Sequence, residues 1–488
     1  MAGKETFSTS LKENEQLLRQ LVGQQRGAIF RRVPMPDPSG SECLLVFFEV
    51  EMDQIRLELL VIRPIIAGEV GPDGLPDRLP PSSQKMNSVV QAIEFMYRGK
   101  VLLLQDGKAD VYALEVAEPP HRAIMPPETE SGISGPRESL TEIHVMNLAI
   151  LRRRYPGVDL RIEPHWVGTK AKLEIAMVYL KGRPTDRMLD EVRARLSQIV
   201  QDGMQDVTEL TEAIADRSLS VFPTVLITER PDIISHYLSS GRIALLMDNS
   251  PRCLIVPAVF MDLFTSADDF YEWRPFVTFL RFLRFIAFNI AVPLPALYVS
   301  VTTYHLQALP TQLTLSLLAQ REGAPLPPPV EAAIMTLMFE ILREAGVRLP
   351  RAIGPTVSIV GGLVIGDAAI RSGLTSPAMV LVVSATAVAT FSLPSTMLAN
   401  AATYYRFFVL FLASTFGFFG LLLGYLVALG NVAGLTSLGV PYMAPTFPFQ
   451  RKHISAAFGS KPRPPKGRGA APEPGLTREA QDFQERRQ

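Results

Sequence analysis

Three acidic residues lie within or beside long apolar stretches in the C-terminal part of the chain: Glu331, Glu340 and Asp367. A carboxyl group in a hydrophobic segment is costly unless it faces a partner, a polar cavity or water, so an acid there is a functional candidate. Carboxylate oxygens are also the acceptors that a cation needs where the bilayer offers none. The three residues are therefore predicted candidates for an ion pathway or a gate.

A structural role is the alternative for the same acids. Arginines lie close to them in the sequence, at predicted helix ends: Arg343, Arg348 and Arg371. Acids that pair with such arginines would fix helix packing rather than attract ions. The sequence leaves both roles open.

Asp367 belongs to an apolar stretch, residues 353–370, which is long enough to be a candidate membrane span and carries no other charge. Small residues recur in it at intervals of four: Gly354, Ser358, Gly362 and Gly366. Residues four apart share one face of a helix, so these positions predict a seam along which a neighbouring helix can approach closely. The glycines lack the Lys-Ser/Thr ending of a phosphate loop, so we interpret the run as a helix-packing motif.

Other apolar segments predict a helical membrane domain around this seam. Residues 285–304 are uncharged, and Pro293 and Pro295 in their middle predict a kinked or broken helix. Residues 374–393 and 407–429 are two further uncharged spans. With residues 353–370, these segments make four firm spans.

Two segments between these spans have a different character. Residues 306–319 are too short to span comfortably, and residues 326–346 are amphipathic, with acids and an arginine gathered on one helical face. We expect one or two interfacial, re-entrant or pore-lining helices there.

Composition favours a hybrid of α/β and membrane regions. Hydrophobic residues make up 47% and charged residues 20% of the 488 residues, which is apolar for a soluble protein and polar for one that is membrane throughout. The expected fold is a mixed α/β N-terminal soluble region of two subdomains followed by an α-helical transmembrane domain. The predicted domains are an α/β subdomain over 1–135, a second over 136–270, the helical membrane domain over 271–448 and a disordered basic tail over 449–488.

The α/β region contains a pattern that occurs twice. A helix, a glycine, a basic residue, an apolar strand, an aspartate and a second strand follow one another in residues 88–116 and again in residues 232–257. This similarity predicts an internal duplication, although any such unit of helix and hairpin looks alike. Further predicted elements are a helix over 11–21, strands over 43–50 and 55–62, and a long helix over 136–154.

Common catalytic and metal-binding patterns are absent from the sequence. The six histidines are scattered, the two cysteines, Cys43 and Cys253, lie apart within apolar strands, and there is no nucleophile elbow. We expect neither an enzyme nor a metal or cofactor site. Lys+Arg and Asp+Glu both total 48, so the overall charge favours no nucleic-acid partner, and the opening residues lack the apolar core of a signal peptide.

Several long blocks closely resemble the A subunit of GerA-type spore germinant receptors. The most specific are REGAPLPPPVEAAIMTLMFEILREAGVRLP at 321–350 and GPTVSIVGGLVIGDAAIRSGLTSPAMVLVV at 354–383. SGPRESLTEIHVMNLAILRRR at 134–154 and SLGVPYMAP at 437–445 add to them. The resemblance covers about 134–448, and residues 1–130 match only loosely.

The resemblance implies a receptor subunit of the spore inner membrane, with its N-terminal domain and C-terminal tail on the cytoplasmic, core side. Its implied partners are a transporter-like B subunit that binds nutrients and a lipoprotein C subunit. It further implies a homo-oligomeric ring that conducts cations when nutrient binds and so triggers germination. A sporulation-operon paralogue shares the fold and would act as an accessory ion-release channel or a scaffold.

Two other functions stay open from the residues alone. A secondary transporter should show repeats among its spans and paired broken helices, whereas the only repeat in this sequence lies in the α/β region. A membrane scaffold without conduction is the other. The few spans favour a channel built by oligomerisation over a self-contained carrier.

Overall fold

The structure is a computed structural model, and it describes residues 6–22, 27–36, 42–48, 54–68, 84–97, 99–116, 127, 130, 132, 134–157, 159–170, 172–200, 202–216, 220–322, 325–348 and 354–444; the side chains of residues 347, 354–360 and 363 are outside the description. The predicted tail over 449–488 also lies outside it. Contacts divide the chain into two compact units. The first contains Met1–Ser218 and Val225–Pro257, and the second contains Leu219–Thr224 and Ala258–Lys466.

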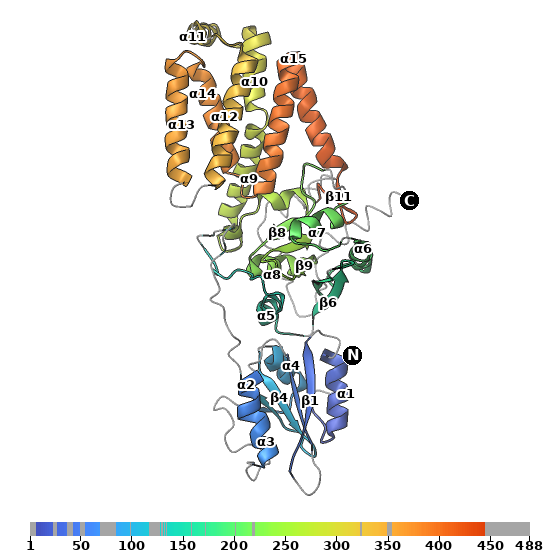
Figure 1. Cartoon of the computed structure of the whole chain (residues 1–488). Coiled ribbons are helices and arrows are strands. Elements are labelled where there is room, and N and C mark those ends of the chain that lie inside the picture. The colour runs from blue at the N-terminus through green and yellow to red at the C-terminus, as the bar shows by residue number, and fades with distance from the viewer. Residues whose placement is uncertain are drawn as a thin grey trace, which may run out of the picture. The chain divides into compact units, whose positions relative to one another are not determined.

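The first subdomain is an antiparallel sheet covered by helices on both faces (Figure 1). Its strands lie in the order β1-β2-β4-β5-β3, and their bounds are β1 Ala28–Pro34, β2 Glu42–Phe48, β3 Gln84–Met86, β4 Val101–Gln105 and β5 Val111–Leu114. Successive side chains of a strand point to opposite faces. Leu44 and Val46 accordingly pack with helices α1 (Leu11–Val22) and α4 (Val89–Tyr97), whereas Cys43 and Leu45 pack with the helices on the other face.

The helix covering that other face corrects one prediction. Residues 55–62, expected to be a strand, form the helical run α2 (Gln54–Leu57), the π-helix η2 (Glu58–Ile62) and α3 (Arg63–Ala67). Its buried residues are Leu57, Val61, Ile62 and Ile65. This spacing follows one face of a helix rather than the alternation of a strand, so apolar composition alone was misleading here.

The second subdomain repeats the topology of the first. Its antiparallel strands lie in the order β6-β7-β9-β10-β8, which matches β1-β2-β4-β5-β3 position by position. Their bounds are β6 Leu160–Val167, β7 Leu173–Leu180, β8 Leu226–Thr228, β9 Ile243–Met247 and β10 Cys253–Val256. The helices recur at equivalent places in the chain: α5 (His144–Arg154), α6 (Asp186–Ser197), α7 (Val207–Ile214) and α8 (Pro231–Ser239). The equal strand orders support the internal duplication, and the mixed α/β fold of two subdomains is confirmed.

The long helix expected over 136–154 is wrong in its first half. Helix α5 begins at His144, and the preceding residues run beside the end of β8. The Leu140 N–H donates to the Glu229 carbonyl at 2.8 Å, and the Arg230 guanidinium donates to the Pro136 carbonyl at 3.2 Å. These bonds to the backbone of residues 136 and 140 take the place of the predicted helical ones.

Glu130, which precedes these residues in the sequence, also contacts the end of β8, and its contact depends on pH. The Thr228 hydroxyl donates to Glu130 Oε2 at 2.5 Å, and the Glu130 N–H donates to the Glu229 carboxylate at 3.1 Å. Burial is the largest cause of a rise in the pKa of the Glu130 carboxyl from 4.5 to about 7; the Thr228 hydrogen bond opposes it and the Glu229 charge adds to it. Between about pH 4.5 and pH 7, the Glu130 carboxyl is therefore protonated in the folded chain and ionised in the unfolded chain.

We expect the free energy of unfolding of this region to fall as the pH rises from about 4.5 to about 7, and to level off above, because the folded state binds more protons in that window. The Glu130→Gln variant should lose this slope. Urea titrations of the full chain in detergent, followed between pH 4.5 and pH 8, measure it. The exposed Glu212→Gln variant should retain the slope of the parent, and an unchanged slope in Glu130→Gln would disprove the assignment.

The second unit is mainly helical. Its helices are α9 Arg274–Ala291, α10 Leu294–Tyr304, α11 Thr311–Arg321, α12 Pro328–Arg348, α13 Gly354–Arg371, α14 Pro377–Phe391 and α15 Thr396–Gly434. Among the described residues, α15 alone is long and apolar enough to cross a membrane, and α9 with α10 pass the same test as a pair bent by 41°. Only 33% of the most apolar window of α15 is buried, so most of it faces outward.

Helix α15 is a hairpin rather than the continuous span expected over 407–429. Gly417 has φ 60° and ψ −138°, and the chain folds back there into two arms (Figure 1). Asn431 on the second arm donates to the Tyr405 hydroxyl on the first. Gly424 also approaches Val409 so closely that an added Cβ would lie 3.2 Å from its Cγ2. The correction has a simple cause, because only glycine adopts this backbone conformation readily.

Candidate functional site

Arg406 on the first arm of α15 joins four helices of the second unit. The side chain is fully buried, and its Nη1 donates to Glu340 Oε1 of α12 at 2.7 Å. Its Nη2 donates to the Thr390 hydroxyl of α14 at 2.5 Å, and its Nε donates to the Ala291 carbonyl at the end of α9 at 2.8 Å. We call Arg406, Glu340, Thr390 and the Ala291 carbonyl the Arg406 junction.

The break between α9 and α10 explains why this arginine is needed. In a continuous helix the Ala291 carbonyl would accept the N–H of residue 295, but Pro295 has none. A carbonyl left unpaired in an apolar setting costs several kcal/mol. The Arg406 Nε–H satisfies it, so the junction holds the broken helix in place.

Glu340 carries two arginine contacts. Besides Arg406, its carboxylate contacts the Arg343 guanidinium at 2.8 Å and accepts a bond from the Thr403 hydroxyl at 3.1 Å. Its side chain is 12% exposed. Buried charges persist in proteins when they are paired and hydrogen-bonded, and Glu340 meets both conditions.

Glu331 fixes α12 to the start of α14. Its Oε1 accepts bonds from the Ser376 N–H at 2.6 Å, the Thr375 hydroxyl at 2.7 Å and the Ser376 hydroxyl at 2.9 Å. The residue is 1% exposed, and its Oε2 has no hydrogen-bond partner among the described residues. A carboxylate at a helix N-terminus interacts favourably with the helix dipole, so Glu331 stabilises the N-terminus of α14.

Replacing Glu331 should therefore destabilise the helical unit in a graded way. Glu331→Leu leaves three donors unsatisfied and should cost on the order of 3 kcal/mol, whereas Glu331→Gln keeps an acceptor oxygen and should cost about 1 kcal/mol. Unfolding of the purified chain in detergent, followed by circular dichroism, gives the two values. Equal costs for both variants would contradict the role of Oε1.

Asp367 lies apart from the other two acids. Its carboxylate contacts the Arg371 guanidinium one turn further along α13 at 2.8 Å, and both side chains are largely exposed, at 55% and 78%. The structure thus brings Glu340 to the Arg406 junction, places Glu331 at the start of α14 and leaves Asp367 on an open face. The sequence left open that these acids pair with nearby arginines in a structural role. Two such pairs are present, Glu340–Arg343 and Asp367–Arg371, whereas Arg348 pairs with Glu344.

The small-residue seam lies on α13 as expected, and part of it contacts neighbouring helices of the same chain. A Cβ on Gly362 would lie 3.6 Å from Leu342 of α12, and one on the adjacent Gly361, which is not a seam residue, would lie 2.8 Å from the same side chain. A Cβ on Gly366 would lie 3.6 Å from Val380 of α14. The surroundings of Gly354 and Ser358 fall outside the described side chains.

Sequence reasoning did not find Arg406. The residue stands immediately before the predicted span over 407–429 and was left outside it. One signal could have shown it: Arg406 is the only charged residue within α15, and a lone charge in an apolar helix needs a partner. Its partner Glu340 was among the predicted candidates.

The chain thus combines a duplicated α/β region with a helical unit that holds a buried ion pair and, among the described residues, one helix long and apolar enough to cross a membrane. A family model described as Bacillus/Clostridium GerA spore germination protein matches residues 16–466. The chain belongs to this family of germinant-receptor A subunits.

Several known proteins are similar to this chain. Spore germination protein KA of Bacillus subtilis (strain 168) is 34% identical over 459 residues, covering 93% of this chain and 84% of the relative. Spore germination protein GerLA of Bacillus cereus is 35% identical and covers 86% and 82%, and the uncharacterized membrane protein YfkQ of Bacillus subtilis (strain 168) is 35% identical and covers 93% and 90%. A crystal structure of the N-terminal domain of the A subunit of the Bacillus megaterium spore germinant receptor GerK3 matches 52% of this chain and 97% of that one, at 22% identity and a TM-score of 0.39.

Proposed function

We propose that this chain is a subunit of a nutrient germinant receptor in the spore inner membrane, and that copies of it assemble into a nutrient-gated cation channel that triggers germination. Family membership supports the receptor role. A transporter-like B subunit and a lipoprotein C subunit are its proposed partners. The candidate ion-pathway or gating residues are Glu331, Glu340 and Asp367.

The open face of α13 is the observation that carries the channel hypothesis. This helix packs mainly against α12, and it leaves an exposed charged pair, Asp367 and Arg371, beside the exposed apolar side chain of Val364. Charged side chains in apolar helices face the protein interior or a water-filled cavity rather than lipid. A ring of copies would give α13 such an environment, with the Asp367 carboxylates lining it.

The charge distribution supports an orientation with both termini on the cytoplasmic side. Basic residues are frequent after the last helix, where they are typical of a cytoplasmic segment: Arg451, Lys452, Lys461, Arg463, Lys466 and Arg468. The proposed passes are α9 with α10, α12, α13, α14 and the two arms of α15. Their number is even, so the chain returns to the side on which it began.

Cation flux from proteoliposomes tests the site. We expect Asp367→Asn to lower the K⁺ efflux at least fivefold, because it removes the charge from the proposed pathway, while assembly stays normal. Glu340→Gln should alter gating, because Arg406 loses its counter-charge. The exposed pair Glu344 and Arg348 offers a control, since Glu344→Gln should conduct as the parent does. If both Asp367→Asn and Glu340→Gln show the same flux and gating as the parent, these acids have a structural role and are not part of the ion pathway.

A secondary transporter is the second candidate, and the broken helix α9–α10 favours it. Transporters often place substrates at discontinuous helices, and the Arg406 junction lies at this break. The native mass of the detergent-purified chain separates the two functions. A channel formed between copies requires a closed oligomer, whereas a carrier also works as a monomer.

A further inference from the structure

A hollow of about 470 Å³ opens in the first subdomain between the edge strand β1 and the helical run of α2, η2 and α3. Its volume falls within the range of roughly 300–1,000 Å³ that is typical of small-molecule sites. The sheet contributes Ile29, Arg31 and Phe47 to the lining, and the helical run contributes the charged side chains of Glu58 and Arg63. We call this space the β1 hollow.

Most of the lining of the β1 hollow is apolar. Ile29 of β1 lies opposite Phe47 of β2, and the Phe47 side chain is 4% exposed. The helical run adds Leu57, which is buried, and Leu59, which is 49% exposed. An apolar group that covers such side chains gains about 25 cal/mol for each Å² removed from water. The hollow therefore suits a ligand with an apolar body.

Three charged side chains interrupt this apolar lining. Arg31 lies two residues after Ile29 and so shares its face of β1, and its guanidinium contacts the Glu58 carboxylate at 3.5 Å. Within the part of the chain that the structure describes, Arg63 has no ion-pair partner. Two guanidinium groups against one carboxylate leave one positive charge in the hollow.

The π-helix η2 brings Glu58 and Arg63 to the hollow together. The Arg63 N–H donates to the Glu58 carbonyl five residues earlier, which closes one π-turn. In a regular α-helix, residues five apart would lie about 140° apart around the axis. The π-turn is rare in proteins and is frequent at functional sites, where it re-aims side chains.

The second subdomain has a hollow at the equivalent place, between β6, β7 and α6, but its chemistry differs. Glu163 of β6 accepts bonds from the Arg193 guanidinium at 2.8 and 3.0 Å and from the Tyr179 hydroxyl at 2.5 Å. Further charged side chains, among them Arg161 and Lys181, line the rest. Of the two equivalent hollows, the β1 hollow is therefore the one with apolar surface for a ligand.

We propose that the β1 hollow binds a small molecule with an apolar body and a single carboxylate. The carboxylate contacts the Arg63 guanidinium, whose planar fork matches the two carboxylate oxygens. The apolar body lies against Ile29 and Phe47. One monoanion neutralises the single positive charge of the hollow. This site belongs to the α/β region alone, so its test is independent of ion conduction.

Fluorine NMR of 4-fluorophenylacetate with the full chain in nanodiscs tests the site, with empty nanodiscs as the blank. We expect saturable binding to the parent. Arg63→Met should weaken the affinity at least fivefold, because the charged hydrogen bonds to the carboxylate are lost. Glu58→Gln should strengthen it at least twofold, because this change removes the negative charge from the hollow and frees Arg31.

Two measurements separate the carboxylate from the apolar body. The uncharged 4-fluorobenzyl alcohol should bind the parent at least fivefold more weakly than 4-fluorophenylacetate does, because it lacks the group that Arg63 contacts. Leu59→Trp fills part of the hollow and should abolish binding of both probes. Since Leu59 is half exposed, this variant should keep the thermal midpoint of the parent.

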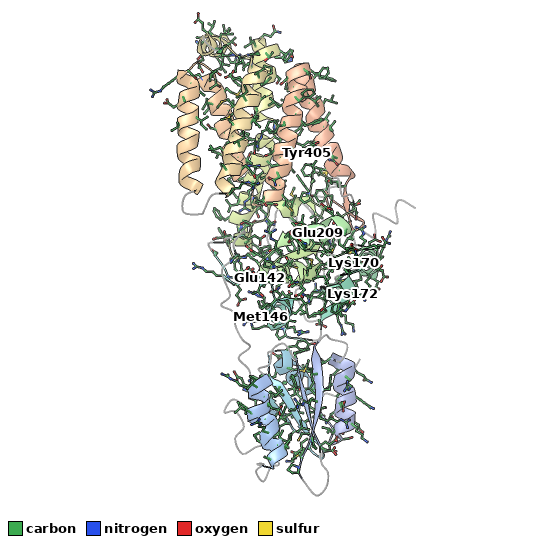
Figure 2. The ribbon with its side chains drawn as sticks, viewed as in Figure 1. Glu142, Met146, Lys170, Lys172, Glu209 and Tyr405 are labelled. Carbon is green, nitrogen blue, oxygen red and sulfur yellow. The ribbon has the colours of Figure 1, made fainter. Side chains whose placement is uncertain are left out.

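Two cations of the second subdomain serve as controls. Lys172→Met removes an exposed charge (Figure 2), and Arg161→Met removes one from the equivalent hollow; both variants should bind 4-fluorophenylacetate as the parent does. Three results would overturn the proposal. The parent binds no more probe than empty nanodiscs do, or Arg63→Met and Leu59→Trp bind with the affinity of the parent, or Arg161→Met weakens binding while Arg63→Met does not.

Discussion

Replacing Arg406 by methionine should lower the free energy of unfolding of the helical unit by about 3–5 kcal/mol, which is typical when one partner of a buried ion pair is removed. The substitution leaves the Glu340 carboxylate with Arg343 alone and unpairs the Ala291 carbonyl. Denaturant titration of the detergent-purified chain measures the change. The break between α9 and α10 should loosen at the same time.

Arg371→Met is the matched control for this prediction. Arg371 forms the same kind of contact with an acid, but the pair is exposed, so its loss should cost less than about 1 kcal/mol. In the double variant Arg406→Met with Glu340→Leu, no unpaired carboxylate remains and part of the stability should return. Equal effects of Arg406→Met and Arg371→Met would show that the junction is not a stabilising centre.

Gly417→Ala should destabilise the hairpin of α15 by about 1–3 kcal/mol, because a residue with a Cβ rarely adopts φ 60° with ψ −138°. The new methyl group would also lie 3.0 Å from Cγ of the Tyr304 ring. The Tyr304 hydroxyl donates to the Ser414 carbonyl at 2.7 Å, so the ring cannot retreat without losing a bond at the hairpin tip. A lower thermal midpoint in detergent is the expected result.

Gly430→Ala tests whether the destabilisation arises from the conformation at the tip of the α15 hairpin. Gly430 lies on the second arm of the same hairpin, and an added Cβ would meet nothing within 4 Å. Alanine is the better helix former there, so the midpoint should stay or rise slightly. If both glycine variants lowered the midpoint alike, the strained conformation at Gly417 would not be the cause.

The sequence predicted best where the apolar pattern was long or repeated. The duplicated strand pairs of the α/β region are continuous apolar runs, and the structure places them at equivalent positions of two sheets with the same strand order. Pro293 and Pro295 predicted the break between α9 and α10, since proline removes helix hydrogen bonds wherever it stands. The positions of Glu331 and Glu340 on one helix were predicted as well.

Contacts between residues far apart in the sequence determine the features that the sequence did not predict. Glycines are ordinary in apolar helices, and nothing near Gly417 in the sequence distinguishes the one that reverses the chain. The partners of Glu331 come from the start of α14, and those of Glu340 come from α15, so distant residues determined which acid is neutralised and which stabilises a helix N-terminus. The helix predicted over residues 136–143 is absent for the same reason, because the Leu140 N–H bonds to Glu229, the residue that follows β8.

Current recorded across a planar bilayer containing the purified oligomer tests the proposed channel most directly. A cation channel formed between copies should give discrete current steps, and under a KCl gradient their reversal potential should follow K⁺. The Asp367→Asn variant should give smaller steps. A bilayer that holds the assembled chain but shows no steps, or steps whose reversal potential follows Cl⁻, would contradict the account.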